Sequence, residues 1–144
     1  MDPRDHIEIH ELYALYGHRM DAGDAEGWAR LFTPDGSWDR VEEPGGEAVF
    51  SVAGFDDLVA FAKEDYAGRG AGKGRHWMGN VVLEGEAPRA RGRTYGFLLQ
   101  LIDGEVRFVA HGNFEDELVK TGEGWRFARR AVLLLNESDI PSES

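Results

Sequence analysis

Apolar side chains recur at steps of three and four residues in three stretches of the chain, and this spacing places them on one face of an α-helix. The predicted helices cover residues 5–22, 24–32 and 55–66. The apolar faces of the first two consist of Ile9, Leu12, Tyr13, Tyr16, Met20, Trp28, Leu31 and Phe32. Gly23 separates them, because glycine readily adopts the left-handed conformation that ends a helix. The N-terminal half is therefore predicted to be largely helical.

The second half of the chain has a different pattern, with long β-prone runs separated by short turn sequences. Strands are predicted at residues 37–41, 47–52, 75–84, 89–102, 105–119 and 125–135. The turns G-E-A-P, D-G and T-G-E-G are too short for crossover connections, so the four long strands are expected to be antiparallel neighbours. The order of predicted helices followed by long antiparallel strands indicates an α+β fold, with a curved antiparallel sheet wrapped around the three helices of the N-terminal half. The concave side of such a sheet encloses an apolar hollow, the usual kind of small-molecule site.

Length and charge limit the classes of function. The 144 residues are 42% hydrophobic, which suits one domain over residues 1–144 with a single core. There are 27 acidic residues against 16 Lys and Arg, a net charge of −11, so neither nucleic acid nor an anionic membrane surface is expected as a partner. The chain lacks Cys, and its N-terminus M-D-P-R-D-H lacks an apolar leader. These features predict a soluble cytoplasmic protein.

The corner between the first two helices holds the first candidate for chemistry. Asp5 is predicted to cap the first helix, with Glu8 reaching back to it. Asp21 falls in the last turn of that helix, where the helix dipole opposes a negative charge by roughly 0.3 to 1 kcal/mol. This position favours a carboxyl group that exchanges a proton near neutral pH, as a general acid or base requires. The alternative is a solvated Asp in a turn between helices, and spacing alone does not separate the two.

Three sequence segments have a recognisable order. The motif Y-x-x-x-M-D-x-x-D-x-x-x-W-x-x-L-F-T-P-D (16–35) is followed by R-H-W-M-G-N (75–80) and by L-V-K-T-G-E-G-W-R-F-A-R-R (118–130). Together they resemble the SnoaL-like branch of the nuclear transport factor 2-like (NTF2-like) superfamily, over residues from about 5 to 135. That group includes scytalone dehydratase, bile-acid 7α-dehydratase, ketosteroid isomerases and polyketide cyclases. The resemblance implies a cone-shaped α+β barrel and a reaction that needs no cofactor and no metal.

The resemblance also implies a set of site residues. Asp21 occupies the position of the dehydratases' catalytic aspartate, His76 lies near their catalytic histidine, and Tyr16 matches an active-site tyrosine of the bile-acid enzyme. In such a site the His moves a proton from the carbon next to a carbonyl to a departing hydroxyl, and the Tyr polarises the carbonyl oxygen. Asp21 either orients the His or acts as a base itself. The residues expected to contact the substrate are Tyr13, Trp38, Asn80, Phe97, His111 and Asn113.

Three points stay open at the level of sequence. Tyr16 lies on the buried stripe and is as easily a core residue as a catalytic one. Only one of His76 and Trp77 can face the hollow, because side chains alternate along a strand. Where the relatives carry a second acid or His on the fourth strand, this chain has Phe97 and Leu98, and His111 or Asn113 on the next strand is the candidate substitute.

The sequence therefore predicts a cofactor-independent dehydratase or isomerase that uses Asp/His proton transfer on a small apolar carbonyl compound, such as a polyketide, alicyclic or steroid-like molecule. A polyketide cyclase of the same fold is an alternative, because it begins with the same proton transfer. A non-catalytic small-molecule-binding protein or assembly module is a second alternative. The outer face of the sheet, with Arg91, Arg93 and Gln100 among aliphatic residues, is expected to pair with further copies in a dimer or trimer.

Overall fold

The computed structural model describes residues 1–135, in which three helices precede or interrupt six strands. The helices are α1 (Pro3–Asp21), α2 (Ala25–Ala29) and α3 (Phe55–Gly68). The strands are β1 (Phe32–Val41), β2 (Ala48–Ala53), β3 (Gly74–Glu86), β4 (Arg89–Ile102), β5 (Glu105–Thr121) and β6 (Gly124–Leu134). Residues 136–144, which the sequence assigns to the same domain, lie outside the described residues.

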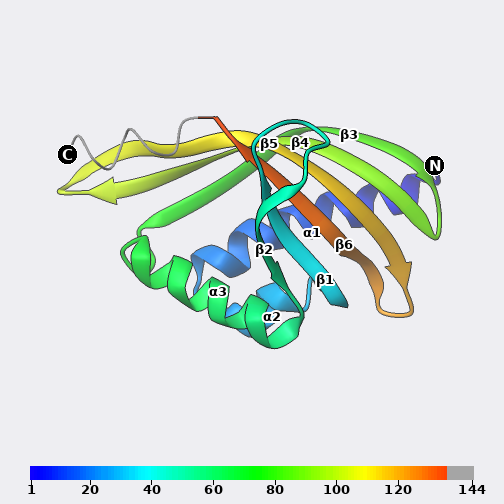
Figure 1. Ribbon diagram of the computed structural model, residues 1–144, viewed down its shortest axis with the longest axis horizontal. Helices are drawn as coiled ribbons and strands as arrows, with labels where there is room; N and C mark the ends of the chain where they lie inside the picture. Colours follow the sequence, from blue (N-terminus) through cyan, green and yellow to red (C-terminus); the bar gives the residue numbers. More distant parts are fainter. Residues whose placement is uncertain (136–144) are drawn as a thin grey trace.

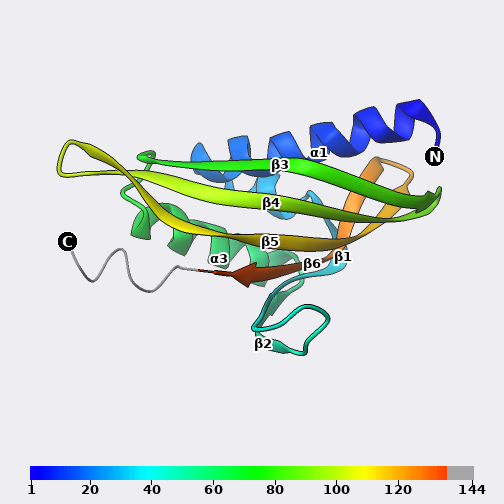
Figure 2. The ribbon, with the colours of Figure 1, turned by 90° about the horizontal axis from the view of Figure 1, so that it is seen from above.

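All six strands belong to one sheet, in the order β2-β1-β6-β5-β4-β3. The long strands β3 to β6 are antiparallel neighbours, whereas β1 and β6 pair in parallel and make the sheet mixed. Figure 1 shows the sheet curving over the helices, and Figure 2 shows α1 running alongside β3. The predicted α+β fold, with a curved sheet around helices of the N-terminal half, is confirmed. The parallel β1–β6 pair is not evident from the turn sequences.

β-Bulges account for the curvature of the long strands. The β3–β4 register shifts between Gly79 and Val82, where Asn80 adopts a φ of 53°. Further shifts occur at Leu98 in the β4–β5 pair and at Glu117 in the β5–β6 pair. A bulge bends its strand and increases the local twist. The sheet therefore wraps over the helices and leaves a hollow between the two layers.

The second helix is shorter than the apolar spacing predicts, and β1 begins at Phe32 rather than at residue 37. The Leu31 carbonyl accepts a hydrogen bond of 2.9 Å from the Phe127 N–H, and Phe32 pairs with Phe127 across the β1–β6 ladder. These long-range contacts draw the chain into the sheet after Ala29. The apolar side chains of Leu31 and Phe32 still reach the core, where they are 2% and 4% exposed.

The prediction that Asp5 caps α1 is wrong. Asp2 is the cap, and its carboxylate accepts a hydrogen bond of 2.8 Å from the Arg4 N–H. Asp5 is instead buried, and its Oδ1 accepts hydrogen bonds from Lys120 Nζ and Trp125 Nε1, both at 2.9 Å. The bonds from Lys120 and Trp125 hold the pKa of the Asp5 carboxyl below its usual value. Asp5 thus fastens the start of α1 to the hairpin between β5 and β6.

An aromatic and aliphatic core fills the space between the helices and the sheet. Its largest members are nearly or completely inaccessible: Ile9, Trp28, Leu58, Trp125 and Phe127. Full burial of a large apolar side chain contributes roughly 1.5 to 3 kcal/mol, so this cluster is a principal source of stability. Within residues 1–135, none of the helices combines the length and apolar character that crossing a membrane requires.

Candidate active site

Asp21 and His76 form a bonded pair where the end of α1 meets the start of β3. Asp21 Oδ1 lies 2.6 Å from His76 Nδ1. The carboxylate also accepts the backbone N–H of His76, at 3.2 Å to Oδ1 and 3.0 Å to Oδ2. The two side chains are only 12% and 18% exposed, respectively. Because the carboxylate engages Nδ1, Nε2 is the ring nitrogen left to act on a ligand.

A close approach of α1 to β3 brings the pair together. Gly17 lies one helical turn before Asp21, and a Cβ atom at Gly17 would lie 2.9 Å from the backbone oxygen of His76. Any side chain there would push α1 away from β3. In the sequence, Gly17 is a residue without a side chain on the apolar face of the helix. The structure shows that this lack of a side chain allows the close contact between α1 and β3.

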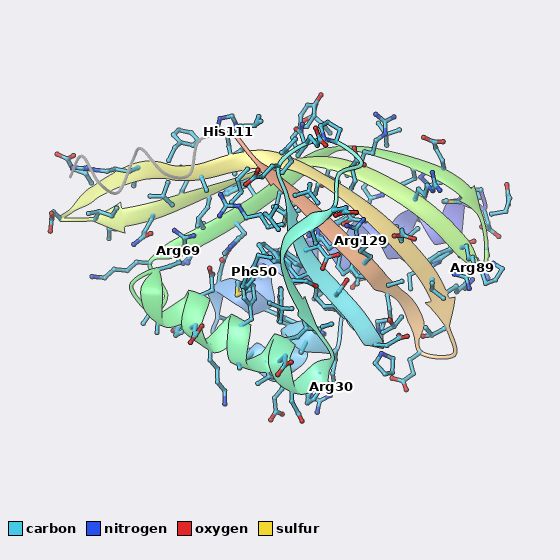
Figure 3. The ribbon with its side chains drawn as sticks, viewed as in Figure 1. Arg30, Phe50, Arg69, Arg89, His111 and Arg129 are labelled. Carbon is cyan, nitrogen blue, oxygen red and sulfur yellow. The ribbon has the colours of Figure 1, made fainter. Side chains whose placement is uncertain are left out.

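His76 lies in the wall of a cavity of about 350 Å³ beneath the curved sheet. The apolar part of the wall includes Trp38, Phe50, Phe61, Leu98, Phe114 and Val132. Figure 3 labels two residues of the wall, Phe50 on the edge strand β2 and Arg69 at the end of α3. The polar residues of the wall are Tyr16, Arg40, Asp65, Arg69, His76 and His111. A largely apolar chamber with a few polar groups is the usual form of a small-molecule site.

Tyr16 borders this cavity, and its hydroxyl is a candidate hydrogen-bond donor to a ligand. It accepts a hydrogen bond of 3.0 Å from Trp38 Nε1, so its own proton is left to donate to a ligand. Its ring meets the His76 ring edge-on, with 6.4 Å between the centroids. Burial raises the pKa of Tyr16 to about 12, against the opposing effect of the positive charge of Arg130. The hydroxyl therefore stays protonated at neutral pH.

Behind Tyr16 lies a buried ion pair between Arg130 on β6 and Asp116 on β5. Arg130 Nε and Nη2 lie 3.0 Å and 3.3 Å from the two Asp116 carboxylate oxygens, and both side chains are 0% exposed. The guanidinium carbon is 4.3 Å from the centroid of the Tyr16 ring and 4.2 Å from that of Phe114. A positive charge in this poorly screened place favours the partial negative charge that Tyr16 acquires when it donates its proton.

A second hollow, of about 600 Å³, lies between α1 and β3 on the other side of the pair. Asp21 borders this hollow and is absent from the wall of the 350 Å³ cavity, whereas His76 borders both. His76 is thus the member of the pair that can touch a ligand in the cavity. This placement favours Asp21 as the group that orients His76 over Asp21 as the base.

The structure brings Asp21, His76 and Tyr16, the three expected catalytic residues, to one place. Both His76 and Trp77 border the cavity. The His76 side chain is only 18% exposed and is bonded to Asp21, whereas Trp77 is 56% exposed and stacks on Phe97 on the outer face of the sheet. The alternation of side chains along β3 therefore directs His76 inward.

Of the residues expected to contact the substrate, Trp38, Phe97 and His111 border the cavity. Phe97 and His111 pair across β4 and β5, and they alternate with the buried residues Leu98 and Ala110. Their side chains therefore project from the outer face of the sheet, and Figure 3 shows His111 on that side, away from the helices. We assign Phe97 and His111 to the edge of the cavity rather than to its floor.

Tyr13, Asn80 and Asn113 lie outside the cavity wall, which corrects the expectation that they contact a ligand there. Tyr13 packs inside the core with its ring 5.2 Å from the Arg130 guanidinium carbon. Asn80 is exposed because it sits at the β3 bulge, where the regular alternation is broken. Asn113 shares the outward parity of His111 and borders a separate small hollow.

Asp65 and Arg69 border the cavity from α3, although the sequence pattern does not single them out. Asp65 lies three residues after Ala62 and seven after Leu58, both of which are buried. Residues at these spacings share one helix face. A carboxylate on the inward face of the third helix is the signal in the sequence that points to this residue.

Comparison with known proteins agrees with the fold. A family model described as SnoaL-like domain matches residues 3–131. The chain belongs to the SnoaL-like domain family. Similar solved structures include a protein of unknown function from Mycobacterium tuberculosis, which is 25% identical, with 99% of this chain and 81% of that chain covered and a TM-score of 0.79.

This SnoaL-like domain is also similar to an NTF2-like protein with a cystatin-like fold from Novosphingobium aromaticivorans, at 24% identity over 97% of this chain and 88% of that chain, with a TM-score of 0.78. A third similar structure is Aln2 from a Streptomyces species, at 20% identity over 100% and 99% of the two chains, with a TM-score of 0.78. No functionally curated protein matches the sequence. These likenesses show the NTF2-like fold, which supports many different reactions, so function has to be argued from the site.

Proposed function

We propose that this SnoaL-like domain is a cofactor-independent lyase or isomerase that transfers protons on a small, mostly apolar carbonyl compound. The observation that supports this most strongly is the 2.6 Å contact between Asp21 and His76 beside a cavity whose wall also includes Tyr16. A base, a group that orients it and a donor for an oxyanion are what proton abstraction next to a carbonyl requires. The acidic, cysteine-free chain is expected to act in the cytoplasm.

His76 is the proton-transfer group in this proposal. Its Nδ1–H is donated to Asp21, which fixes the tautomer and leaves the Nε2 lone pair free in the cavity. Nε2 takes a proton from the carbon next to the substrate carbonyl, and the Asp21 carboxylate stabilises the imidazolium that forms. General acid–base catalysis of this kind contributes about 10² to 10⁴ in rate.

Tyr16 stabilises the other end of the reacting group. As the carbon loses its proton, negative charge grows on the carbonyl oxygen, and the Tyr16 hydroxyl donates a hydrogen bond to it. Trp38 holds the phenol oxygen in place, and Arg130 lies behind the ring. The proton on Nε2 then either assists departure of a hydroxyl, which gives dehydration, or returns to a different carbon, which gives isomerisation.

The cavity favours a flat, apolar substrate body. Its volume of about 350 Å³ lies at the lower end of the range for small-molecule sites. Trp38 and Phe61 provide neighbouring aromatic surfaces, with 4.7 Å between their ring centroids. A polyketide, alicyclic or steroid-like carbonyl compound meets these requirements.

One observation favours the binding-only alternative. The β4 residues that face the cavity from the inner side of the sheet are Gly96 and Leu98, so this strand supplies apolar groups where the related dehydratases carry a polar one. A protein that only bound the ligand would need no proton transfer. Exchange of substrate protons with solvent therefore separates this alternative from the proposal.

Indan-1-one is a suitable probe, because it is flat and carries acidic hydrogens next to its carbonyl. Incubation in D₂O followed by mass spectrometry records exchange at that carbon. We expect the wild-type domain to accelerate exchange, and Asp21→Asn and His76→Ala to abolish the acceleration without loss of fold by circular dichroism. His10→Ala, which removes an exposed imidazole on α1, is the matched control. Equal exchange in the wild type and both site variants would refute the catalytic proposal.

Product mass then separates the possible reactions. Candidate hydroxylated carbonyl compounds are incubated with the domain, and the products are compared with those formed by His76→Ala. Loss of one water identifies a dehydratase. A rearranged product of unchanged mass identifies an isomerase or a polyketide cyclase, which ring-specific nuclear magnetic resonance signals then distinguish.

A further inference from the structure

Asp65 borders the cavity from α3, and one of its carboxylate oxygens has no hydrogen-bond partner among the described residues. This oxygen, Oδ2, is buried. The other oxygen, Oδ1, lies 3.5 Å from Arg69 Nε one turn further along the helix. The whole side chain is only 19% exposed. Buried carboxylate oxygens normally accept hydrogen bonds, so Oδ2 is an acceptor that lacks a donor, in a residue that borders the cavity.

The unpaired oxygen faces the reactive nitrogen of His76. Asp65 Oδ2 and His76 Nε2 are 3.9 Å apart, which is too long for a hydrogen bond between them. If one oxygen atom lay at hydrogen-bond distance from both, the angle Oδ2···O···Nε2 at that atom would be roughly 90°. A hydroxyl group suits this position, because it donates one hydrogen bond and accepts another along well-separated directions.

We propose that Asp65 binds the hydroxyl group of a β-hydroxy carbonyl substrate at the point between Asp65 Oδ2 and His76 Nε2. The hydroxyl donates its hydrogen to Oδ2 and accepts from Nε2–H once His76 is protonated. This inference rests on the proposed function, and it adds both a substrate class and a further residue to it. Arg69 supports the arrangement by pairing with Oδ1, which leaves Oδ2 as the oxygen without a partner.

The chemical step balances without a further reactant. Nε2 takes the proton from the carbon that lies between the carbonyl and the hydroxyl-bearing carbon, and the C–H electron pair forms the enolate. Nε2–H then protonates the hydroxyl oxygen, the C–O bond breaks with its electron pair on that oxygen, and water departs. A carbon–carbon double bond conjugated with the carbonyl remains. Asp65 holds the hydroxyl hydrogen throughout and ends the step unchanged.

Two probes that differ by one hydroxyl test the role of Asp65 through binding. Calorimetric titration compares 3-hydroxyindan-1-one with indan-1-one in the Asp21→Asn background, which is expected to be folded and not to convert the hydroxylated probe. The background is used alone, with Asp65→Ala, and with Glu64→Gln, in which the neighbouring exposed carboxylate is neutralised. A hydrogen bond to a charged acceptor corresponds to a preference of about 10- to 100-fold. We expect the background and its Glu64→Gln variant to show this preference for the hydroxylated probe, and Asp65→Ala to lose it. An unchanged preference in Asp65→Ala overturns the proposal.

The reaction itself gives a second, independent readout. Dehydration of 3-hydroxyindan-1-one to inden-1-one is expected to fall by about 100-fold in Asp65→Ala, whereas deuterium exchange into indan-1-one, which has no hydroxyl to hold, stays within about threefold of wild type. If Asp65→Ala does not fold, Asp65→Asn, which keeps the shape and removes the charge, replaces it in both assays.

The two proposals fail in different ways. Wild-type exchange together with unimpaired dehydration by the Asp65 variants rejects Asp65 and leaves the proposed function standing. Absence of exchange and dehydration in the wild type rejects the proposed function. In that case the binding comparison still decides whether Asp65 recognises a hydroxyl group.

Discussion

Asp21 binds His76 at two points, the ring nitrogen Nδ1 at 2.6 Å and the backbone N–H at 3.0 Å. The first contact serves the chemistry, and the second joins α1 to β3. Asp21→Asn keeps an oxygen for the backbone N–H but loses the charge that supports the imidazolium, whereas Asp21→Ala loses both contacts. We therefore expect both variants to lose about 10²- to 10⁴-fold in exchange rate, and only Asp21→Ala to lower the thermal midpoint clearly. Equal destabilisation by both would show that the backbone contact contributes nothing.

Tyr16 makes a prediction at alkaline pH. Its pKa is raised from the ordinary value of 10.0 to about 12 by burial, so the folded chain keeps the phenol proton where an unfolded chain would release it. The stability that this provides is fully present below pH 10 and is lost as pH rises toward the folded value. We expect the decline in unfolding free energy across this range to be smaller in Tyr16→Phe, measured by urea denaturation at several pH values. An identical decline in the wild type and Tyr16→Phe would contradict the assignment.

The same residue has a separate catalytic prediction. Tyr16→Phe removes the donor for the carbonyl oxygen but keeps the ring that packs against Trp28 and Phe127. Loss of one oxyanion donor lowers kcat by about 10²- to 10³-fold. Exchange into indan-1-one is expected to fall by that factor, whereas an exchange rate equal to that of wild type would remove Tyr16 from the mechanism.

Gly17 permits the contact between helix and strand on which the Asp21–His76 pair depends. Alanine favours a helix over glycine by about 0.8 to 1 kcal/mol, but its Cβ would lie 2.9 Å from the His76 backbone oxygen. Gly17→Ala is therefore expected to displace His76 and to slow exchange by about 100-fold, since a displacement near 1 Å has an effect of that size. Gly68→Ala is the control, because a Cβ there meets nothing within 4 Å. Full activity in Gly17→Ala would refute this account.

The buried pair of Arg130 and Asp116 makes a prediction about stability. Asp116→Asn leaves the guanidinium in the core without its counter-charge, and breaking such a pair typically destabilises a protein by about 3 to 5 kcal/mol. The exposed pair of Arg30 and Glu26, at 3.7 Å, offers the contrast, because Glu26→Gln should change stability by less than about 1 kcal/mol. Urea denaturation of the two variants measures the difference. Similar effects would mean that the buried pair is not a structural element of the core.

Local patterns in the sequence predict those parts of the fold that depend on neighbouring residues. The helical stripe through Leu12, Tyr16 and Met20 and the short turns between the long strands are signals of this kind. The end of α2 is not predicted by a local pattern. Leu31 and Phe32 continue the helical spacing, but their backbone is bonded to Phe127, far away in the chain. The parallel β1–β6 pair has the same long-range origin.

The residues of the candidate site also differ in how far local sequence patterns predict their positions. Asp21, His76 and Tyr16 stand in motifs, and the fold brings them together. Asn80 has the same strand parity as His76, but Asn80 lies within the β3 bulge, where the regular alternation of side chains is broken. Asp65 has the helical spacing of a buried position, which is a signal in the sequence, yet an acidic residue on an amphipathic helix is usually solvated. The packing of α3 is needed to place Asp65 in the cavity wall.

The outer face of the sheet carries exposed aromatic side chains on the three strands β3, β4 and β5. Trp77, Phe97 and Phe108 are 56%, 37% and 57% exposed, and Phe97 contacts both of the other rings. A contiguous apolar surface of this kind is typical of a protein–protein contact. It lies on the face opposite the helices, so association through it would leave them uncovered.

The charges on this face favour a second copy of the chain as the partner. Arg91 and Arg93 on β4 lie in register with Glu117 and Glu115 on β5, so the face presents a positive row beside a negative one. A copy related by a two-fold axis can place each row against its opposite. We therefore predict a homodimer formed through the outer face.

Sedimentation at a series of concentrations tests this prediction. We expect dimers in the wild type and monomers in Phe97→Glu, because that substitution places a charge in the middle of the aromatic cluster, where it is unpaired and desolvated. Ile7→Glu, which changes a residue that is 68% exposed on α1, is the control and is expected to remain dimeric. A wild type that stays monomeric at high concentration, or a Phe97→Glu variant that still dimerises, would show that the outer face is not the interface.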